Sequence, residues 1–574
     1  MNWIKLSRHD KLQHHALICS LWSLAVILGA IDAWYYRHNM SPDGISYLDV
    51  ADAYLRGDWE MAINGYWSPL YSWLLGVAMM LLSPTPYWEA SVVHLVNLVI
   101  FLGTLASAHF FLREFLSCHA ERVVRHSEEQ NLISLPGWAF WVLGYVLVIW
   151  SSLNLISIRE ESPDMCVAAF VYLAAGVLLR IRRGLASALT FALLGVILGF
   201  GYLSKAAMFP LSFIFLGVSL FSVGNLRQAL PRVLSALVIF LLVGGPFLFA
   251  LSKAKGRLTF GDVGKLAYVW FVHDVTPFIH WQGEGNVGVP KHATRRIFSA
   301  PIIYEFASPN MGTYPPWYDP SYWYEGVRVG FDWKAQLAVL VENIRGYFRT
   351  FFESVQSGLI VGFLILYTMG RRGWFCVRDL LGQWNLLIPA MTAFGMYSLV
   401  YIETRYIGAY VVLLWLGIAA GVQLPESQQS RRLATTVSMA MILLVTSTVM
   451  GLNLDRAYTV GRYLLKWRDP RPHFQWHVAN SLQSLGVEKG DRVASIGRSF
   501  DAYWARLARV QIVAEIPKKQ AFDFWAADPV IKSQVIKAFA STGAKIIVAD
   551  VGSLITGEDW KRIANTRYYV YLLK

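Results

Sequence analysis

The sequence predicts an α-helical membrane protein that crosses the bilayer many times and carries a small α/β domain at its C-terminal end. Of 574 residues, 55% are hydrophobic and 16% are charged, whereas a soluble domain typically has about 25% charged residues. Apolar stretches of membrane-spanning length recur between residues 15 and 452. After residue 453 the pattern changes, and short β-branched runs alternate with helical ones, as in an α/β domain.

About eleven apolar runs are long enough to cross a hydrocarbon core, which takes about 17 to 25 helical residues. They lie at 15–34, 88–112, 137–156, 165–180, 185–203, 207–223, 233–251, 355–370, 383–402, 405–422 and 433–452. A further run, 69–83, is short and is followed by two prolines within 83–86. We expect it to form an interfacial helix in the first outer loop, because a break at proline ends a helix.

Arginine and lysine collect in alternate loops, for example at Arg180, Arg182 and Arg183. Since such residues stay on the cytoplasmic side during insertion, the N-terminus is predicted to be cytoplasmic. The outer side then receives 35–87, 253–354 and the end of the chain. The formal net charge of +13 is explained by the inner loops, which predicts contact with anionic membrane lipids and no nucleic-acid partner.

Four domains follow from this topology. They are a membrane module that includes the first outer loop, a large outer loop, a second group of spans and an outer α/β domain, at 1–252 (loop 35–87), 253–354, 355–452 and 453–574. The strand-like runs of the last domain lie at 492–496, 511–514, 545–549 and 568–572. The turn after the first of these runs lacks the full glycine fingerprint of a phosphate-binding loop, so we interpret it as a plain strand-to-helix turn.

Asp43 stands just outside the first span and is followed by a polar and aromatic loop that runs to Tyr71. A carboxylate in such a place is suited to take a proton from a hydroxyl or amine, as a general base does. The alternative is structural, because a Pro-Asp-Gly sequence ahead of a helical run also suits helix capping. Asp49 and Asp52 share a face of the same predicted helix, where solvated carboxylates are the commoner outcome.

Glu160, Glu161 and Asp164 crowd a short outer loop between two spans. Buried unpaired charge is costly there, which indicates a role for these carboxylates. The structural alternative is pairing with Arg159 and capping of the next span.

Lys205 and Arg405 are predicted at the outer ends of spans. Long basic side chains in such places commonly extend to the membrane interface. Arg405 also has Glu403 two residues before it, so an ion pair between them is a further alternative.

The large outer loop contains a dense aromatic run at 314–324. Flat aromatic faces suit a wall that contacts a sugar or a lipid, and an interfacial aromatic belt is the alternative. The candidate wall residues are His280, Trp281, Trp317, Tyr318 and Trp323.

The order of several short motifs resembles that of a known family. The motifs are Asp43-Gly44, the aromatic stretch 67–71, the acidic loop 160–164, the segment 201–205 and, more loosely, 403–406. Over about residues 10 to 250, the chain resembles the polytopic glycosyltransferases of the GT-C superfamily. That group includes protein O-mannosyltransferases, lipid A aminoarabinose transferases and single-subunit bacterial oligosaccharyltransferases.

This resemblance implies a GT-C-like fold and an inverting transfer of a sugar from a polyprenyl-phosphate donor to a glycan, lipid or protein acceptor. Asp43 would be the general base, and Asp164, with Glu161 and Glu160, a second acidic site. Lys205 and Arg405 would contact the lipid phosphate. If a metal is used, Asp43 and Asp164 would hold Mg²⁺ or Mn²⁺. The enzyme would lie in a bacterial inner membrane with its C-terminal domain in the periplasm.

Two other functions stay open. A transporter of lipid-linked sugars would be expected to show inverted repeats or interrupted helices around a midplane site, and the sequence shows neither. A non-catalytic membrane subunit of a glycan-assembly system would use its C-terminal domain to recruit enzymes.

Overall fold

The structure is a computed structural model. It describes residues 8–130, 132–275, 280–285, 287–306, 311–370, 374–466, 473–550, 559–563 and 566–573. The described chain divides into two compact units, each built from three segments. Unit 1 comprises Met1–Tyr36, Asn97–Ala250 and Trp333–Trp467, and unit 2 comprises Arg37–Val96, Leu251–Asp332 and Arg468–Lys574.

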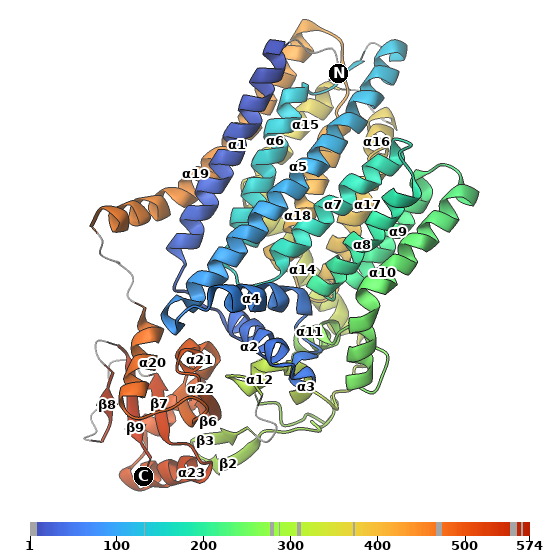
Figure 1. The fold of residues 1–574 in the computed structure, drawn as a ribbon. Coiled ribbons are helices and arrows are strands. Elements are labelled where there is room, and N and C mark those ends of the chain that lie inside the picture. Colours follow the sequence, from blue (N-terminus) through green and yellow to red (C-terminus); the bar gives the residue numbers. More distant parts are fainter. Residues whose placement is uncertain are drawn as a thin grey trace. The chain divides into compact units, whose positions relative to one another are not determined.

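Unit 1 is helical. Its helices are α1 (Arg8–Tyr35), α5 (Glu89–Gln130, which starts in unit 2), α6 (Gly137–Trp150), a π-helical turn (Ser151–Ile156), α7 (Asp164–Arg182), α8 (Ala188–Ser204), α9 (Met208–Ser222), α10 (Leu226–Ala254), α14 (Trp333–Phe352), α15 (Gln356–Met369), α16 (Trp374–Leu381), α17 (Trp384–Ser398), α18 (Thr404–Ala420) and α19 (Gln428–Lys466). Two short strands, β1 (Leu132–Ile133) and β4 (Leu424–Pro425), pair with each other. Figure 1 shows α1, α6 and α19 side by side in this unit.

The chain is a multi-pass membrane protein. Six of the described helices are long and apolar enough to cross a membrane by length and composition, or seven if α14 and α15, which meet at a bend of 74°, form one span. Each of the eleven predicted runs coincides with a helix. Four of those helices, α8, α9, α17 and α18, have only 15 to 17 residues. At about 1.5 Å per residue they rise about 22 to 26 Å, less than a hydrocarbon core of about 30 Å.

In unit 2, α2 (Pro42–Arg56) carries Asp43 and packs against α4 (Pro69–Leu82). Ser41 caps α2 by accepting a hydrogen bond from the Gly44 amide at 3.1 Å, Pro42 occupies the first turn, and Gly57 ends the helix with a φ of 69°. The Ser72 hydroxyl of α4 donates to the Tyr47 carbonyl of α2 at 3.0 Å. The predicted short helix of the first outer loop is therefore present, and it ends before the prolines of 83–86 as expected.

Several shorter elements surround these two helices in unit 2. They are α3 (Trp59–Ala62), a 3₁₀ turn (Pro86–Trp88), α11 (Val263–Phe271), α12 (Pro315–Tyr318), α13 (Pro320–Trp323), α20 (Phe474–Ser484), a second 3₁₀ turn (Ser499–Asp501), α21 (Tyr503–Leu507), α22 (Lys518–Ala526) and α23 (Pro529–Ser541).

A seven-stranded sheet forms the centre of the α/β part of unit 2. Its order is β2-β3-β6-β5-β7-β9-β8, with β5 parallel to β6 and β7 and the other pairs antiparallel. The strands are β2 (Arg295–Ser299), β3 (Ile302–Glu305), β5 (Arg492–Gly497), β6 (Gln511–Pro517), β7 (Ile546–Asp550), β8 (Lys561–Arg562) and β9 (Tyr568–Leu572). The predicted C-terminal α/β fold is confirmed, because all four predicted strands coincide with β5, β6, β7 and β9.

Two strands of this sheet come from the large outer loop. β3 pairs with β6 through Tyr304 opposite Glu515, and Ile303 joins a buried core with Phe524 of α22 and Phe539 of α23. Most of the predicted segments 253–354 and 453–574 thus belongs to one compact unit, whereas α14 and the end of α19 belong to unit 1. The four-domain division itself stays a prediction.

Candidate functional site

Three predicted ionic residues meet in unit 1, although they are far apart in the sequence. Asp164 is the first residue of α7, Lys205 follows the last residue of α8, and Arg405 lies in the first turn of α18. The Lys205 ammonium lies 2.5 Å from Asp164 Oδ1, and Arg405 Nε lies 3.7 Å from Asp164 Oδ2. Two cationic side chains therefore flank one carboxylate at the ends of three helices.

The exposure of these side chains differs. Asp164 is only 2% exposed, whereas Lys205 and Arg405 are 19% and 20% exposed. Arg405 also forms an ion pair with Glu403, as the structural alternative predicted. The Tyr406 ring lies 3.5 Å below the Lys205 ammonium, a distance typical of a cation–π contact. The carboxylate is thus covered, while both cations keep part of their surface accessible.

Local backbone geometry places Asp164 in this cluster. Helix α6 widens into the π-helical turn Ser151–Ile156, and Ser157 then takes a positive φ of 67°. Such π-helical turns and positive φ values in non-glycine residues are frequent at functional sites. The Ser162 hydroxyl donates to Asp164 Oδ2 at 2.9 Å, which fixes the carboxylate at the start of α7.

The two other carboxylates of this loop differ from Asp164. Arg159 Nε donates to Glu160 Oε1 at 2.8 Å, and both side chains are partly exposed, which agrees with the structural alternative for Glu160. Glu161 is buried. The part of Glu160 and Glu161 in a second acidic site stays a prediction.

The surroundings of Asp164 do not support a metal ion shared by Asp43 and Asp164. Within the described ranges, no group of three or more His, Cys, Asp or Glu side chains is arranged to hold an ion. The oxygens of Asp164 face the Lys205 ammonium and the Ser162 hydroxyl, and two nearby cations would repel a divalent ion. Asp164 therefore does not fit the role of a metal ligand.

In unit 2, Asp43 lies in the first turn of α2, where Ser41 acts as the cap. Capping of α2 by the Asp43 side chain was the structural alternative. In the structure the Ser41 side chain caps this helix. Asp43 Oδ1 instead accepts a hydrogen bond from the Trp317 indole Nε1 at 3.1 Å. Because Asp43 belongs to unit 2, its convergence with Asp164, Lys205 and Arg405 stays a prediction.

Trp317 is held against α2 at two further points. Its carbonyl accepts from the Ser46 hydroxyl of α2 at 3.0 Å and from the Trp67 indole at 3.1 Å. Both Trp67 and Trp317 are buried. The aromatic stretch after α2 and the aromatic run of the large outer loop therefore form one structure around Asp43.

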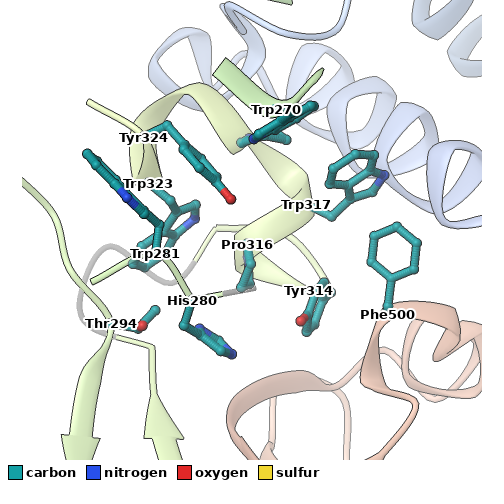
Figure 2. Close-up of a pocket in the computed structure, with 11 residues that line it drawn as sticks. Trp270, His280, Trp281, Thr294, Tyr314, Pro316, Trp317, Trp323, Tyr324 and Phe500 are labelled. Carbon is teal, nitrogen blue, oxygen red and sulfur yellow. The ribbon is translucent and has the colours of Figure 1, made fainter. Parts of the chain in front are cut away.

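The predicted substrate wall contributes to a small pocket in unit 2 (Figure 2), whose volume of about 20 Å³ has room for about one water molecule. Four of the five wall residues line it, His280, Trp281, Trp317 and Trp323, together with the rings of Trp270, Tyr314, Tyr324 and Phe500. Tyr318 does not. Its hydroxyl donates to the Met61 carbonyl at 2.5 Å, so this side chain fastens α12 to α3.

One wall of the pocket is anchored on the sheet. His280 Nε2 lies 2.6 Å from Glu515 Oε1 of β6, and the Tyr314 hydroxyl donates to the same oxygen at 2.8 Å. Burial and the adjacent Glu515 carboxylate hold the pKa of Tyr314 well above its ordinary value, so the phenol keeps its proton and remains a donor.

Sequence reasoning missed the central ion network of unit 2. Arg506 of α21 is 2% exposed and contacts Asp49 at 2.5 Å, Asp52 at 3.0 Å and Glu89 at 3.0 Å. Arg509 adds a second contact to Glu89 at 2.6 Å. Asp49 and Asp52, which the sequence indicated as solvated, therefore join α2 to the α/β part of the unit. The i, i+3 spacing of Asp49 and Asp52, which places both on one face of α2, was the one signal of this network in the sequence.

The fold and these residues define a multi-pass helical membrane protein with a cationic cluster at helix ends in one unit and a carboxylate beside an aromatic pocket in the other. No family model matches the sequence, and neither does any curated protein. Two similar solved structures are ArnT from Cupriavidus metallidurans bound to undecaprenyl phosphate and the archaeal oligosaccharyltransferase AglB from Archaeoglobus fulgidus in complex with an inhibitory peptide and a dolichol-phosphate.

The similarity to both structures extends over most of the chain. ArnT has 14% sequence identity and a TM-score of 0.49, with 97% of each chain covered. AglB has 13% identity and a TM-score of 0.47, with 95% of this chain and 70% of AglB covered.

Proposed function

We propose that the chain is an inverting glycosyltransferase of the GT-C type, which transfers a sugar from a polyprenyl-phosphate donor to an acceptor on the periplasmic side of the membrane. The observation that carries this proposal is the meeting of Lys205 and Arg405 on Asp164. Two partly exposed cations at helix ends suit a phosphate at the membrane surface, because ammonium and guanidinium groups bind phosphate oxygens through charge-assisted hydrogen bonds.

The chemistry needs a base on one side of the sugar and positive charge on the other. Asp43 takes the proton of an acceptor hydroxyl or amine, whose oxygen or nitrogen forms the new bond to the anomeric carbon. The bond from that carbon to the phosphate oxygen breaks, and its electron pair stays on the phosphate. Lys205 and Arg405 stabilise the developing negative charge. A phosphate is already a good leaving group, so no acid is required to protonate it.

Asp164 has a positioning role in this scheme. Held by Ser162 and covered from solvent, it keeps the two cations close together despite their mutual repulsion. When a lipid phosphate approaches, the accessible sides of Lys205 and Arg405 can bind it without exposing Asp164.

The test uses the purified full-length protein and a panel of polyprenyl-phosphate sugars, with release of the carrier lipid as the readout and with water taking the sugar where no acceptor is added. We expect release by the wild type, and loss of turnover with retained donor binding in Asp43→Asn. The exposed Glu60 of unit 2 provides a matched control, since Glu60→Gln removes one carboxylate to which no role is assigned. Full release by Asp43→Asn would exclude Asp43 as the base. Unimpaired glycan assembly in cells that carry Asp43→Asn would favour a non-catalytic subunit.

A further inference from the structure

A cavity of about 610 Å³ lies in unit 1 where α7 ends and α8 and α10 begin, whereas one water molecule occupies about 30 Å³ in the liquid. Three arginines line it, Arg180, Arg182 and Arg232, and we call it the cationic cleft. Asp164 starts α7 and Lys205 follows α8, so the cationic cleft lies at the opposite ends of these helices. The 17 residues of α8 rise about 25 Å at about 1.5 Å per residue, which separates this cleft from the Asp164 cluster.

The positive charge of the cationic cleft is not neutralised within the described ranges. No Asp or Glu lines it there, and neither Arg182 nor Arg232 forms an ion pair there. Arg180 lies 3.9 Å from Glu114, but Arg183 holds the same carboxylate more closely, at 2.9 Å. The start of α8 also lines the cleft and adds the positive end of its helix dipole.

Neutral partners hold Arg182 in one orientation. Its Nη1 donates to Asn385 Oδ1 and its Nη2 to the Gly382 carbonyl, both at 2.7 Å. Asn385 is buried and in turn donates to the hydroxyl of Ser222, a residue of the cleft lining, at 2.7 Å. These contacts fix the guanidinium without compensating its charge, so it is pre-organised for an anion.

Close packing of α10 on α8 brings Arg232 to the cleft (Figure 1). A Cβ atom at Gly195 of α8 would lie 2.3 Å from the Ala236 carbonyl oxygen, and one at Gly199 would lie 2.6 Å from the Val243 side chain. Glycine at these two positions therefore lets the backbones approach. Arg232 stands one helical turn before Ala236 and shares its face of α10, which directs it to the start of α8.

Membrane insertion alone also places arginines near helix ends, because it keeps them on the cytoplasmic side. The exposed Arg227 of α10 fits that explanation, since it does not line the cleft. Insertion requires charge only. It requires neither a cavity nor a pair of neutral partners that orient Arg182, whereas a bound anion accounts for both features.

We propose that the cationic cleft binds a phosphate group, carried by the headgroup of an anionic phospholipid or by a soluble phosphate. Guanidinium groups bind phosphate oxygens through charge-assisted, often paired hydrogen bonds. The cleft lies on the side of the chain that the sequence predicts to be cytoplasmic, where basic pockets between membrane helices bind anionic headgroups. This proposal does not depend on the proposed function, because it uses none of the residues assigned to the donor or the acceptor.

Two measurements on the detergent-purified full-length protein distinguish the two sources of phosphate. In native mass spectrometry with equal amounts of phosphatidylglycerol and phosphatidylcholine, a lipid site retains phosphatidylglycerol preferentially, because the arginines repel the choline ammonium. In thermal unfolding, a site for soluble phosphate raises the thermal midpoint in inorganic phosphate above that in chloride of the same ionic strength. We expect at least one of these responses from the wild type.

Arg232→Gln should weaken the apparent affinity for the responding probe about ten-fold, since one charge-assisted contact is lost. Arg227→Gln is the matched control, because it makes the same change on the same helix outside the cleft lining, and it should have no effect. Arg232→Lys keeps the charge without the planar fork. An intermediate loss is expected for it, and it keeps the test valid if the glutamine variant fails to fold.

Three results would overturn the proposal. The first is the absence of both responses in the wild type. The second is equal weakening in Arg227→Gln and Arg232→Gln, which would assign the binding to general surface charge. The third is a response that neither Arg232 variant changes.

Discussion

The indole Nε1 of Trp317 donates a hydrogen bond to Asp43 Oδ1 across 274 residues of sequence. Asp43 is the proposed base, and Trp317 lines the aromatic pocket. One side chain therefore contacts both the carboxylate and the aromatic pocket.

Trp317→Phe removes this hydrogen bond and keeps an aromatic ring. We expect turnover to fall about ten-fold, because a hydrogen bond to a charged group contributes about 1.5 to 3 kcal/mol, while the acceptor concentration at half-saturation changes little. Steady-state kinetics with varied acceptor check this. Trp333→Phe, at a side chain that is 62% exposed, should have no effect. A higher acceptor concentration at half-saturation with unchanged turnover would show that the indole N–H acts in acceptor binding and not on Asp43.

Lys205→Met removes the closest cation from Asp164. The donor concentration at half-saturation should rise about ten-fold, since one of the two proposed charge-assisted contacts to the donor phosphate is lost. Lys205→Arg should lose less, because the positive charge is kept.

Lys205→Met should also lower the thermal midpoint of unfolding, because the buried Asp164 carboxylate loses its nearest partner. Asp164→Asn in the Lys205→Met background should restore part of the thermal midpoint. A double-mutant cycle should give a coupling of about 1 to 3 kcal/mol. A coupling near zero would mean that the 2.5 Å contact contributes nothing to stability.

Arg506→Met leaves Asp49, Asp52 and Glu89 without their shared cation. Removing one partner of a buried ion pair costs about 3 to 5 kcal/mol, so we expect faster hydrogen exchange in the amides of α2 and α21. Arg498→Met is the control, because its contact with Asp501 at 3.6 Å joins two side chains that are 47% and 43% exposed, and such pairs contribute at most about 1 kcal/mol. Equal exchange in both variants would contradict the assigned role of Arg506.

Arg456→Met tests a buried ion pair between α1 and α19. Arg456 Nη1 donates to both oxygens of Asp32 at 2.7 and 2.9 Å, and Asp32 is fully buried. The variant should unfold at a lower temperature in detergent, because an unpaired carboxylate within a membrane helix is costly. Adding Asp32→Asn should recover part of the loss, and Arg462→Met, at an exposed position of the same helix, should have little effect. A destabilisation that persists unchanged in the double variant would contradict this explanation.

Local patterns in the sequence predicted much of the fold. The β-branched runs now seen as β5, β6, β7 and β9 carry their own propensity, and the apolar runs coincide with helices. β2 and β3 were missed, because β2 pairs only with β3, and β3 joins the sheet by pairing with β6 through residues more than 200 positions apart.

The site residues also differ in whether the sequence predicts them. Asp164, Lys205 and Arg405 were found through the family resemblance, and three helix ends bring them together. Arg506 carries no local signal, since a single arginine in a short helix looks like a surface residue until its three carboxylates are known. Tyr318 was assigned to the pocket wall because its neighbours line it, but its hydroxyl turns to the Met61 carbonyl.

Glu515, which orients both His280 and Tyr314, is synthesised 201 residues after Tyr314. The aromatic pocket therefore lacks its anchoring strand until translation is almost finished, although α2 and Asp43 emerge near the beginning. A chain that ended before β6 would contain Asp43 and Tyr314 without the carboxylate that holds Tyr314 in place.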